Sequence, residues 1–132
     1  MFTRFSPAAK RVLRLAEQEC RNRNHYYVGV EHLLFALCAE PDGATSAELK
    51  ARNIDCDAVH AELRKSLGTG EDRMWDGILV TPRVRTVVAL AEDAVGSREA
   101  VEPADLLRAI ISENGSTAAE LLQRELVQRR AG

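Results

Sequence analysis

The 132-residue sequence lacks an excess of charge of one sign, a long hydrophobic run and a cysteine framework. Lys and Arg number 18 against 20 Asp and Glu, which gives a net charge of -2. Nucleic-acid-binding surfaces need clustered basic residues, so we expect no nucleic acid partner. No run approaches the ~20 apolar residues of a membrane span, and Met1 to Lys10 has no signal-peptide core. We therefore expect no membrane contact and a cytoplasmic location.

The three cysteines, Cys20, Cys38 and Cys56, have no CxxC spacing. An odd number without that spacing argues against a disulfide framework and against a structural zinc site. Cys20 and Cys38 fall on the apolar faces of expected helices. We predict that both are small buried hydrophobic residues.

Motifs of common catalytic sites are absent as well. Gly68 to Glu71 loosely resembles a phosphate loop, but no Lys-Ser or Lys-Thr follows and no strand precedes it. Glu31-His32 lacks the second His of the HExxH zinc motif, and Cys20 with His25 is not a convincing nucleophile pair. We predict no catalytic residue, no metal and no cofactor. The alternative, a small helical hydrolase or metal-binding protein, would require a convergent His/Cys/Glu cluster.

What the sequence does contain is an internal duplication. One copy opens with Ser6-Pro7 and the other with Thr81-Pro82. Such pairs start helices, because the hydroxyl caps free N–H groups and Pro at the first helical position loses no hydrogen bond. Behind each start, apolar residues recur with helical spacing. Val12, Leu13, Leu15, Ala16 and Cys20 match Val87, Val88, Leu90, Ala91 and Val95.

The rest of each copy follows the same helical plan. The apolar face of a second helix comprises Val30, Leu33, Leu34, Leu37 and Cys38 in one copy, and Leu106, Leu107, Ile110 and Ile111 in the other. A short third helix and a fourth over roughly 55–67 complete the first copy, whereas the last helix of the second is truncated. Repeat one spans about 5–67, a Gly-containing linker about 68–80, and repeat two about 81–130.

Two copies that cannot cover their own apolar faces should pack on each other with pseudo-twofold symmetry. We therefore predict one all-α domain over residues 1–132, with seven to eight helices.

Three segments together resemble the N-terminal domain of ClpC-type unfoldases: Met1 to Ser6, Tyr27 to Leu34 with its Gly-Val-Glu-His-Leu-Leu run, and Thr81 to Arg83. The resemblance covers about residues 2–125. It implies a module that recruits substrate proteins or adaptor proteins to a Clp-type unfoldase, and that has no enzymatic activity of its own. ClpC-like members also bind phosphorylated arginine on tagged substrates.

The resemblance further implies one phosphoarginine pocket in each repeat, made by the hydroxyl at the helix start and the Glu of the Gly-x-Glu-His segment. The first repeat keeps both parts, Ser6 and Glu31. The second keeps Thr81, but Ala104 occupies the position that matches Glu31. Glu102 or Asp105 would then have to replace the missing carboxylate. The resulting hypothesis is one competent pocket in the first repeat and one weakened pocket in the second.

Other interpretations stay open at this point. Ser6 and Thr81 are fully explained as helix caps, and a helical repeat without a ligand is the simplest alternative. Phe2 and Val80 are candidates for a peptide or small-molecule surface. The chain is either the first part of an unfoldase or a free-standing adaptor, decoy or antibiotic-sequestering protein. The truncated last helix slightly favours the free-standing protein.

Overall fold

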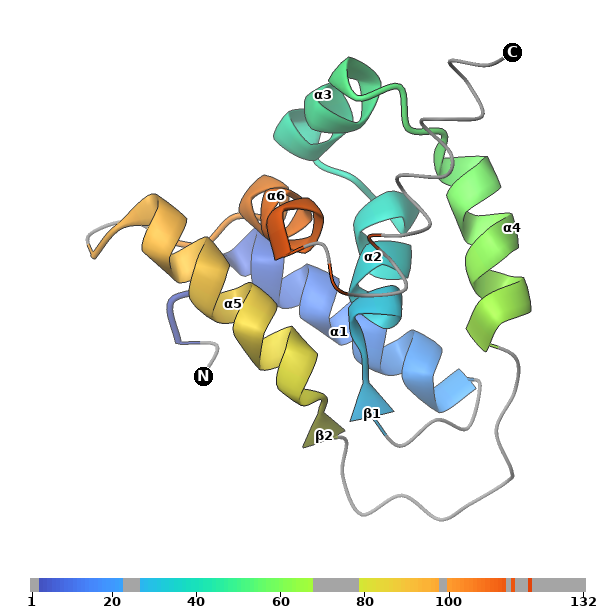
Figure 1. Ribbon diagram of the computed structural model, residues 1–132, viewed down its shortest axis with the longest axis horizontal. Coiled ribbons are helices and arrows are strands. Elements are labelled where there is room, and N and C mark those ends of the chain that lie inside the picture. Colours follow the sequence, from blue (N-terminus) through green and yellow to red (C-terminus); the bar gives the residue numbers. More distant parts are fainter. Residues whose placement is uncertain are drawn as a thin grey trace.

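The computed structural model describes residues 3–22, 27–67, 79–97 and 100–113, together with Gly115 and Ala119. These residues contain six helices and two short strands (Figure 1). In chain order they are α1 (Pro7–Asn22), β1 (Tyr27–Val28), α2 (Val30–Ala39), α3 (Gly43–Ala51), α4 (Cys56–Leu67), β2 (Leu79–Val80), α5 (Pro82–Val95) and α6 (Pro103–Glu113). The predicted all-α class is confirmed.

Helix α2 lies at the centre of the domain. Seven of its ten residues are buried, so it is apolar on nearly every side. Helices α1, α4, α5 and α6 all pack against it (Figure 1). Such a helix must be enclosed by others, because isolated helices of this length are unstable in water. The core of both repeats is therefore one continuous cluster, as the predicted packing of the two copies requires.

The duplication is visible in the helix starts. Ser6 Oγ accepts a hydrogen bond of 3.1 Å from the N–H of Ala9, and Thr81 Oγ1 accepts one of 3.3 Å from the N–H of Val84. Both hydroxyls are thus the predicted caps, each followed by Pro. The predicted fourth helix appears as α4.

The two repeats are joined by two short parallel backbone pairings. Phe5, just before α1, pairs with Val101, just before α6. Val80, just before α5, pairs with Val28, just before α2. Each pairing connects the start of the first helix of one repeat to the start of the second helix of the other. The two pairings are therefore equivalent, as pseudo-twofold symmetry between the repeats requires.

The linker over 68–78 and the expected third and fourth helices of the second repeat lie outside the described residues, apart from Gly115 and the buried Ala119. The repeat boundaries therefore stay predictions.

Thr45 in α3 provides a test of core packing. It is fully buried, and its hydroxyl finds no hydrogen-bond partner in the part of the chain that the structure describes. A buried hydroxyl without a partner costs about 1–3 kcal/mol. We expect Thr45→Val, which replaces the hydroxyl by a methyl group, to leave the free energy of unfolding unchanged or raise it by up to about 1 kcal/mol.

The matched control is Thr45→Ser, which keeps the hydroxyl and removes the methyl group. We expect it to lower the free energy of unfolding by about 1 kcal/mol. Urea denaturation of both variants measures the difference. A Val variant less stable than the Ser variant would contradict this account.

Candidate functional site

The structure places Ser6 and Thr81 at opposite ends of α5. Arg4, two residues before Ser6, forms an ion pair of 3.5 Å with Glu92 in the last turn of α5. Thr81 caps the first turn of the same helix. A helix of 14 residues is about 20 Å long, so the two predicted pockets are well separated.

Glu31 lies at the Thr81 end of the domain. A Cβ atom added to Gly29 would lie 2.8 Å from Oε2 of Glu31 and 4.0 Å from Cγ2 of Thr81. The two side chains therefore converge on one glycine that leaves space between them. The backbone holds the strands together here, since the N–H of Thr81 donates to the carbonyl of Val28 at 3.1 Å. We call Gly29, Glu31 and Thr81 the Thr81 corner.

The carboxylate of Glu31 is available at this corner. Glu31 is half-buried in the first turn of α2, and its carboxylate forms no hydrogen bond or ion pair with any residue that the structure describes. The neighbouring His32 is buried, and its Nδ1 accepts a hydrogen bond of 2.9 Å from the N–H of Gly29. His32 thus caps α2, which leaves the half-buried Glu31 as an ionisable side chain without a capping role at this helix start.

The opposite end of α5 contains the second cluster, the Ser6 corner, made of Ser6 and Glu102. Ser6 Oγ donates a hydrogen bond of 3.0 Å to Oε2 of Glu102. The backbone N–H of Ser6 donates to the carbonyl of Val101 at 2.9 Å, which fixes this contact. The carboxylate of Glu102 therefore occupies the start of α1, where an external anion would have to bind.

This geometry corrects the predicted pairing of site residues. The resemblance predicts one pocket in each repeat, which pairs Ser6 with Glu31, and Thr81 with Glu102 or Asp105. The structure instead places Thr81 near Glu31, around Gly29, and bonds Ser6 to Glu102, since the strand pairings exchange partners between the repeats. Both corners are therefore composite.

Asp105 does not replace the missing carboxylate of the second pocket. Its Oδ2 accepts a hydrogen bond of 2.9 Å from the N–H of Glu102, so it caps α6 as His32 caps α2. Ala104 is buried at the position that matches Glu31. The second repeat thus presents no carboxylate equivalent to Glu31.

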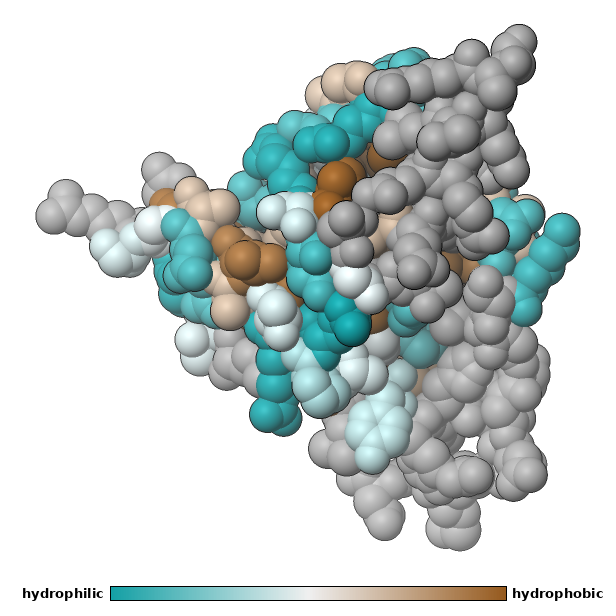
Figure 2. Space-filling model, in the orientation of Figure 1, coloured by the Kyte–Doolittle hydropathy of each residue, from teal (hydrophilic) through white to brown (hydrophobic). Residues whose placement is uncertain are grey.

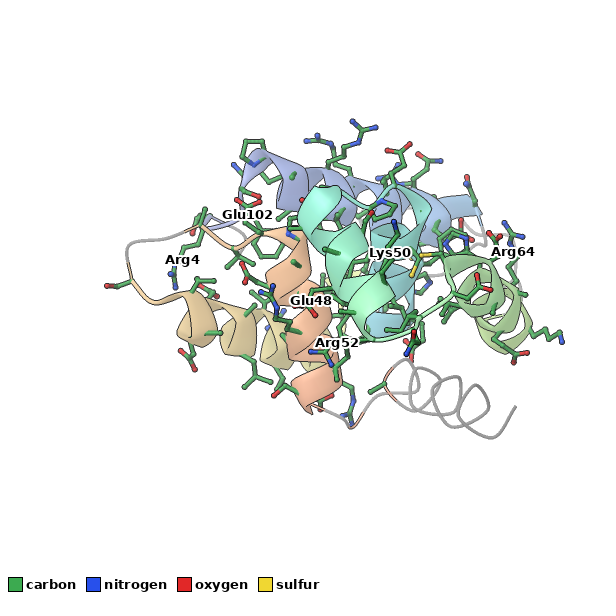
Figure 3. The ribbon with its side chains drawn as sticks, turned by 90° about the horizontal axis from the view of Figure 1, so that it is seen from above. Arg4, Glu48, Lys50, Arg52, Arg64 and Glu102 are labelled. Carbon is green, nitrogen blue, oxygen red and sulfur yellow. The ribbon has the colours of Figure 1, made fainter. Side chains whose placement is uncertain are left out.

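A chain of ion pairs holds the start of α6 against α3 (Figure 3). Arg108 contacts Asp105 at 3.1 Å and Oε1 of Glu48 at 2.8 Å, and Arg52 contacts Oε2 of Glu48 at 3.0 Å. The hydrogen bonds from Arg108, and then from Arg52, lower the pKa of Glu48. The contact between Arg108 and Glu48 joins α6 to α3, whereas each of the other two contacts is local to one helix.

The remaining candidates are placed as follows. Phe2 and His25 lie outside the described residues. Val80 is half-buried and packs against the core, so it offers little apolar surface. The thiol of Cys20 is buried and donates to the carbonyl of Tyr27 at 3.4 Å; burial raises its pKa to about 11. Cys20 is thus a core residue here.

His60 stacks on Phe35, and its Nε2 lies 3.0 Å from the carbonyl oxygen of that residue. Among the residues described, no three or more His, Cys, Asp or Glu side chains form a group that could hold a metal ion. No described helix is both long and apolar enough to cross a membrane.

Sequence reasoning missed one surface feature, an open groove between the first turns of α1 and the connection from α2 to α3. Its lining residues are Pro7, Ala8, Arg11, Val12, Arg14, Leu15, Glu40, Pro41, Asp42 and Pro103. Arg11 and Glu40 form an ion pair across it. Another face, shown in Figure 2, exposes mostly hydrophilic side chains with small apolar areas among the described residues.

The fold defines a helical double-repeat domain with composite corners, and comparison identifies its family. Residues 4–125 match the Clp repeat (R) N-terminal domain family, and the chain belongs to this family. The chain is 36% identical over 123 residues to the ATP-dependent Clp protease ATP-binding subunit ClpC of Staphylococcus aureus (strain USA300). The match covers 92% of this chain and 15% of that protein, so the chain spans a small part of its relative's length.

Solved structures share the fold. The N-domain of ClpV from Vibrio cholerae superposes with a TM-score of 0.75 at 18% identity, over 95% of this chain and 78% of that one. The N-terminal domain of the chaperone ClpD from Arabidopsis thaliana gives a TM-score of 0.58 at 15% identity, over 100% of this chain and 97% of that one. These likenesses support the all-α double-repeat architecture.

The ion pairs of Glu48 generate a pH prediction. A carboxyl whose pKa is lower in the folded than in the unfolded chain stabilises the fold above its unfolded pKa, and this contribution disappears as the pH falls through the folded pKa. We expect Glu48→Gln to lower the free energy of unfolding at pH 7 by about 1 kcal/mol or less, because the pairs are partly exposed. Below about pH 4 the two proteins should converge. Urea denaturation across pH 3–7 measures this, and a difference that persists unchanged in acid would contradict it.

Proposed function

We propose that this domain recognises substrate or adaptor proteins for a Clp-type unfoldase, and that its Thr81 corner binds phosphorylated arginine side chains. The observation that carries the proposal is the available Glu31 carboxylate, which lies with Thr81 around Gly29, while the Thr81 hydroxyl caps α5. In this proposal the domain binds substrate or adaptor proteins and delivers them to the unfoldase, which hydrolyses ATP.

The corner suits both ends of phosphoarginine. Helices α2 and α5 both begin here, and the N-terminal ends of helices attract anions through free N–H groups and the helix dipole. The phosphate group would lie at these helix starts, with Thr81 as an additional hydroxyl. The guanidinium end would face Glu31, because carboxylates and guanidinium groups form paired charged hydrogen bonds.

The Ser6 corner is less suited to such a ligand. Glu102 already places a carboxylate on the Ser6 hydroxyl, so a phosphate group would meet like charge and would have to displace a hydrogen bond. We therefore infer one working pocket in each chain. The single competent pocket of this proposal therefore contains Glu31 and Thr81, rather than Glu31 and Ser6.

The unfoldase is either the continuation of a longer chain or a separate partner to which a free-standing adaptor or decoy docks. ClpC of Staphylococcus aureus, whose name describes an ATP-binding subunit of a protease, favours the first arrangement. The size of the protein on an immunoblot of the source cell distinguishes the two.

Calorimetric titration with free phosphoarginine tests the pocket. We expect one site per chain in the native domain. Glu31→Gln should weaken binding by about tenfold or more, since a hydrogen bond between charged groups contributes about 1.5–3 kcal/mol. The matched change at the other corner, Glu102→Gln, should leave this affinity unchanged. Two equal sites, or equal binding by Glu31→Gln and the native domain, would refute the assignment.

Gly29→Ala tests the shape of the same pocket. The backbone of Gly29 has φ -96°, which alanine adopts without strain, so we expect little change in the melting temperature. The new methyl group would lie 2.8 Å from Oε2 of Glu31 and would force the carboxylate to move. Phosphoarginine affinity should therefore fall about as much as in Glu31→Gln. Unaltered affinity in a folded variant would show that the observed position of Glu31 is unimportant.

A further inference from the structure

Two of the three cysteines meet where α2 ends and α4 begins. Cys38 is in the last turn of α2, and Cys56 is the first residue of α4. The two helices pack side by side (Figure 1). This packing brings the two thiols close enough that each influences the pKa of the other. Both thiols are reduced in this structure.

The two thiols differ in access to solvent. Cys38 is only 4% exposed, whereas Cys56 is half-buried at the surface. A small oxidant therefore reaches Cys56 first. Burial raises the pKa of both thiols. At Cys56 the nearby Cys38 thiol opposes this rise, whereas Asp55 and Asp57 add to it. The start of a helix also favours a thiolate at Cys56, which makes it the better nucleophile of the pair.

We propose that Cys38 and Cys56 are a site of reversible oxidation that forms a disulfide between α2 and α4 when a hydroperoxide reacts with Cys56. In the first step the thiolate of Cys56 attacks a peroxide oxygen, and the O–O bond breaks. Hydrogen peroxide then leaves one oxygen on Cys56 as sulfenic acid and releases the other as water. Cys56 supplies the two electrons.

In the second step the sulfur of Cys38 attacks the sulfur of Cys56. The S–O bond breaks, the S–S bond forms, and the hydroxyl leaves as a second water with the proton of Cys38. In total, two thiols are oxidised and one peroxide is reduced to two waters. A dithiol reverses the reaction by thiol–disulfide exchange.

Cys20 serves as an internal control. It is on α1, fully buried, with its thiol directed to the carbonyl of Tyr27. It takes no part in the contact between Cys38 and Cys56, so it should stay reduced under mild oxidation.

The disulfide would close a loop that contains α3 and would tie together three helices of the first repeat. Closing a loop of this size in the unfolded chain should raise the melting temperature by roughly 10 °C. Glu31 lies at the other end of α2, so phosphoarginine binding should not change. The inference is therefore independent of the proposed function, and either can fail alone.

The experiment treats the reduced protein with equimolar hydrogen peroxide, blocks remaining thiols with an alkylating reagent, and maps peptides by mass spectrometry without reductant. We expect a peptide that links Cys38 to Cys56, an alkylated Cys20, and a higher melting temperature that a dithiol reverses. Cys20→Ser should give the same cross-link, and Cys56→Ser should give none.

The peptide map of the native protein decides the question even where a variant fails to fold. A disulfide that includes Cys20, or oxidation of Cys56 to sulfinic acid without a cross-link, would overturn the proposal. A cross-link that lowers the melting temperature would overturn it as well, because the native packing would then not accommodate the bond.

Discussion

The pairing of backbone between the two repeats determines the rest of this structure. Val28 pairs with Val80, and Phe5 with Val101, so each helix start of one repeat lies beside a helix start of the other. These few hydrogen bonds satisfy backbone groups that would otherwise be buried without partners. They also decide which side chains meet. Because the partners are exchanged, neither corner can form from one repeat alone.

This exchange explains which features the sequence could predict. The caps of α1 and α5 were predictable, because Ser6 and Thr81 hydrogen-bond to N–H groups three residues further along the same chain. The apolar faces of α1 and α2 were predictable for a similar reason, since helical spacing is local. The pairing of Thr81 with Glu31 was not, because it depends on tertiary contacts between residues 50 positions apart. Symmetry of the two copies suggested pockets within each repeat, and the strand pairings contradict that.

The proximity of Cys38 and Cys56 could not be predicted from the sequence either. Sequence rules recognise cysteine pairs by short spacing, whereas these two are brought together by the packing of α2 on α4.

One sequence signal was available for the Thr81 corner: a glycine at the cap position of α2, where Ser, Thr, Asp or Asn would be the usual cap. Gly29 leaves space beside Glu31, and the His32 side chain supplies the missing hydrogen bond.

The two corners show how one duplicated plan can lead to different chemistry. At the Ser6 corner the residue matching Gly29 is Glu102, and its carboxylate is used inside the protein to bind the Ser6 hydroxyl. At the Thr81 corner the carboxylate comes from Glu31, two residues later, and has no partner among the residues that the structure describes. A carboxylate in the first turn of a helix gains only about 0.3–1 kcal/mol from the helix dipole. Glu31 therefore contributes little to the fold, whereas Glu102 helps to join the repeats. A side chain that stability barely requires, in a space that a glycine keeps open, is well placed to bind a cationic group from another molecule.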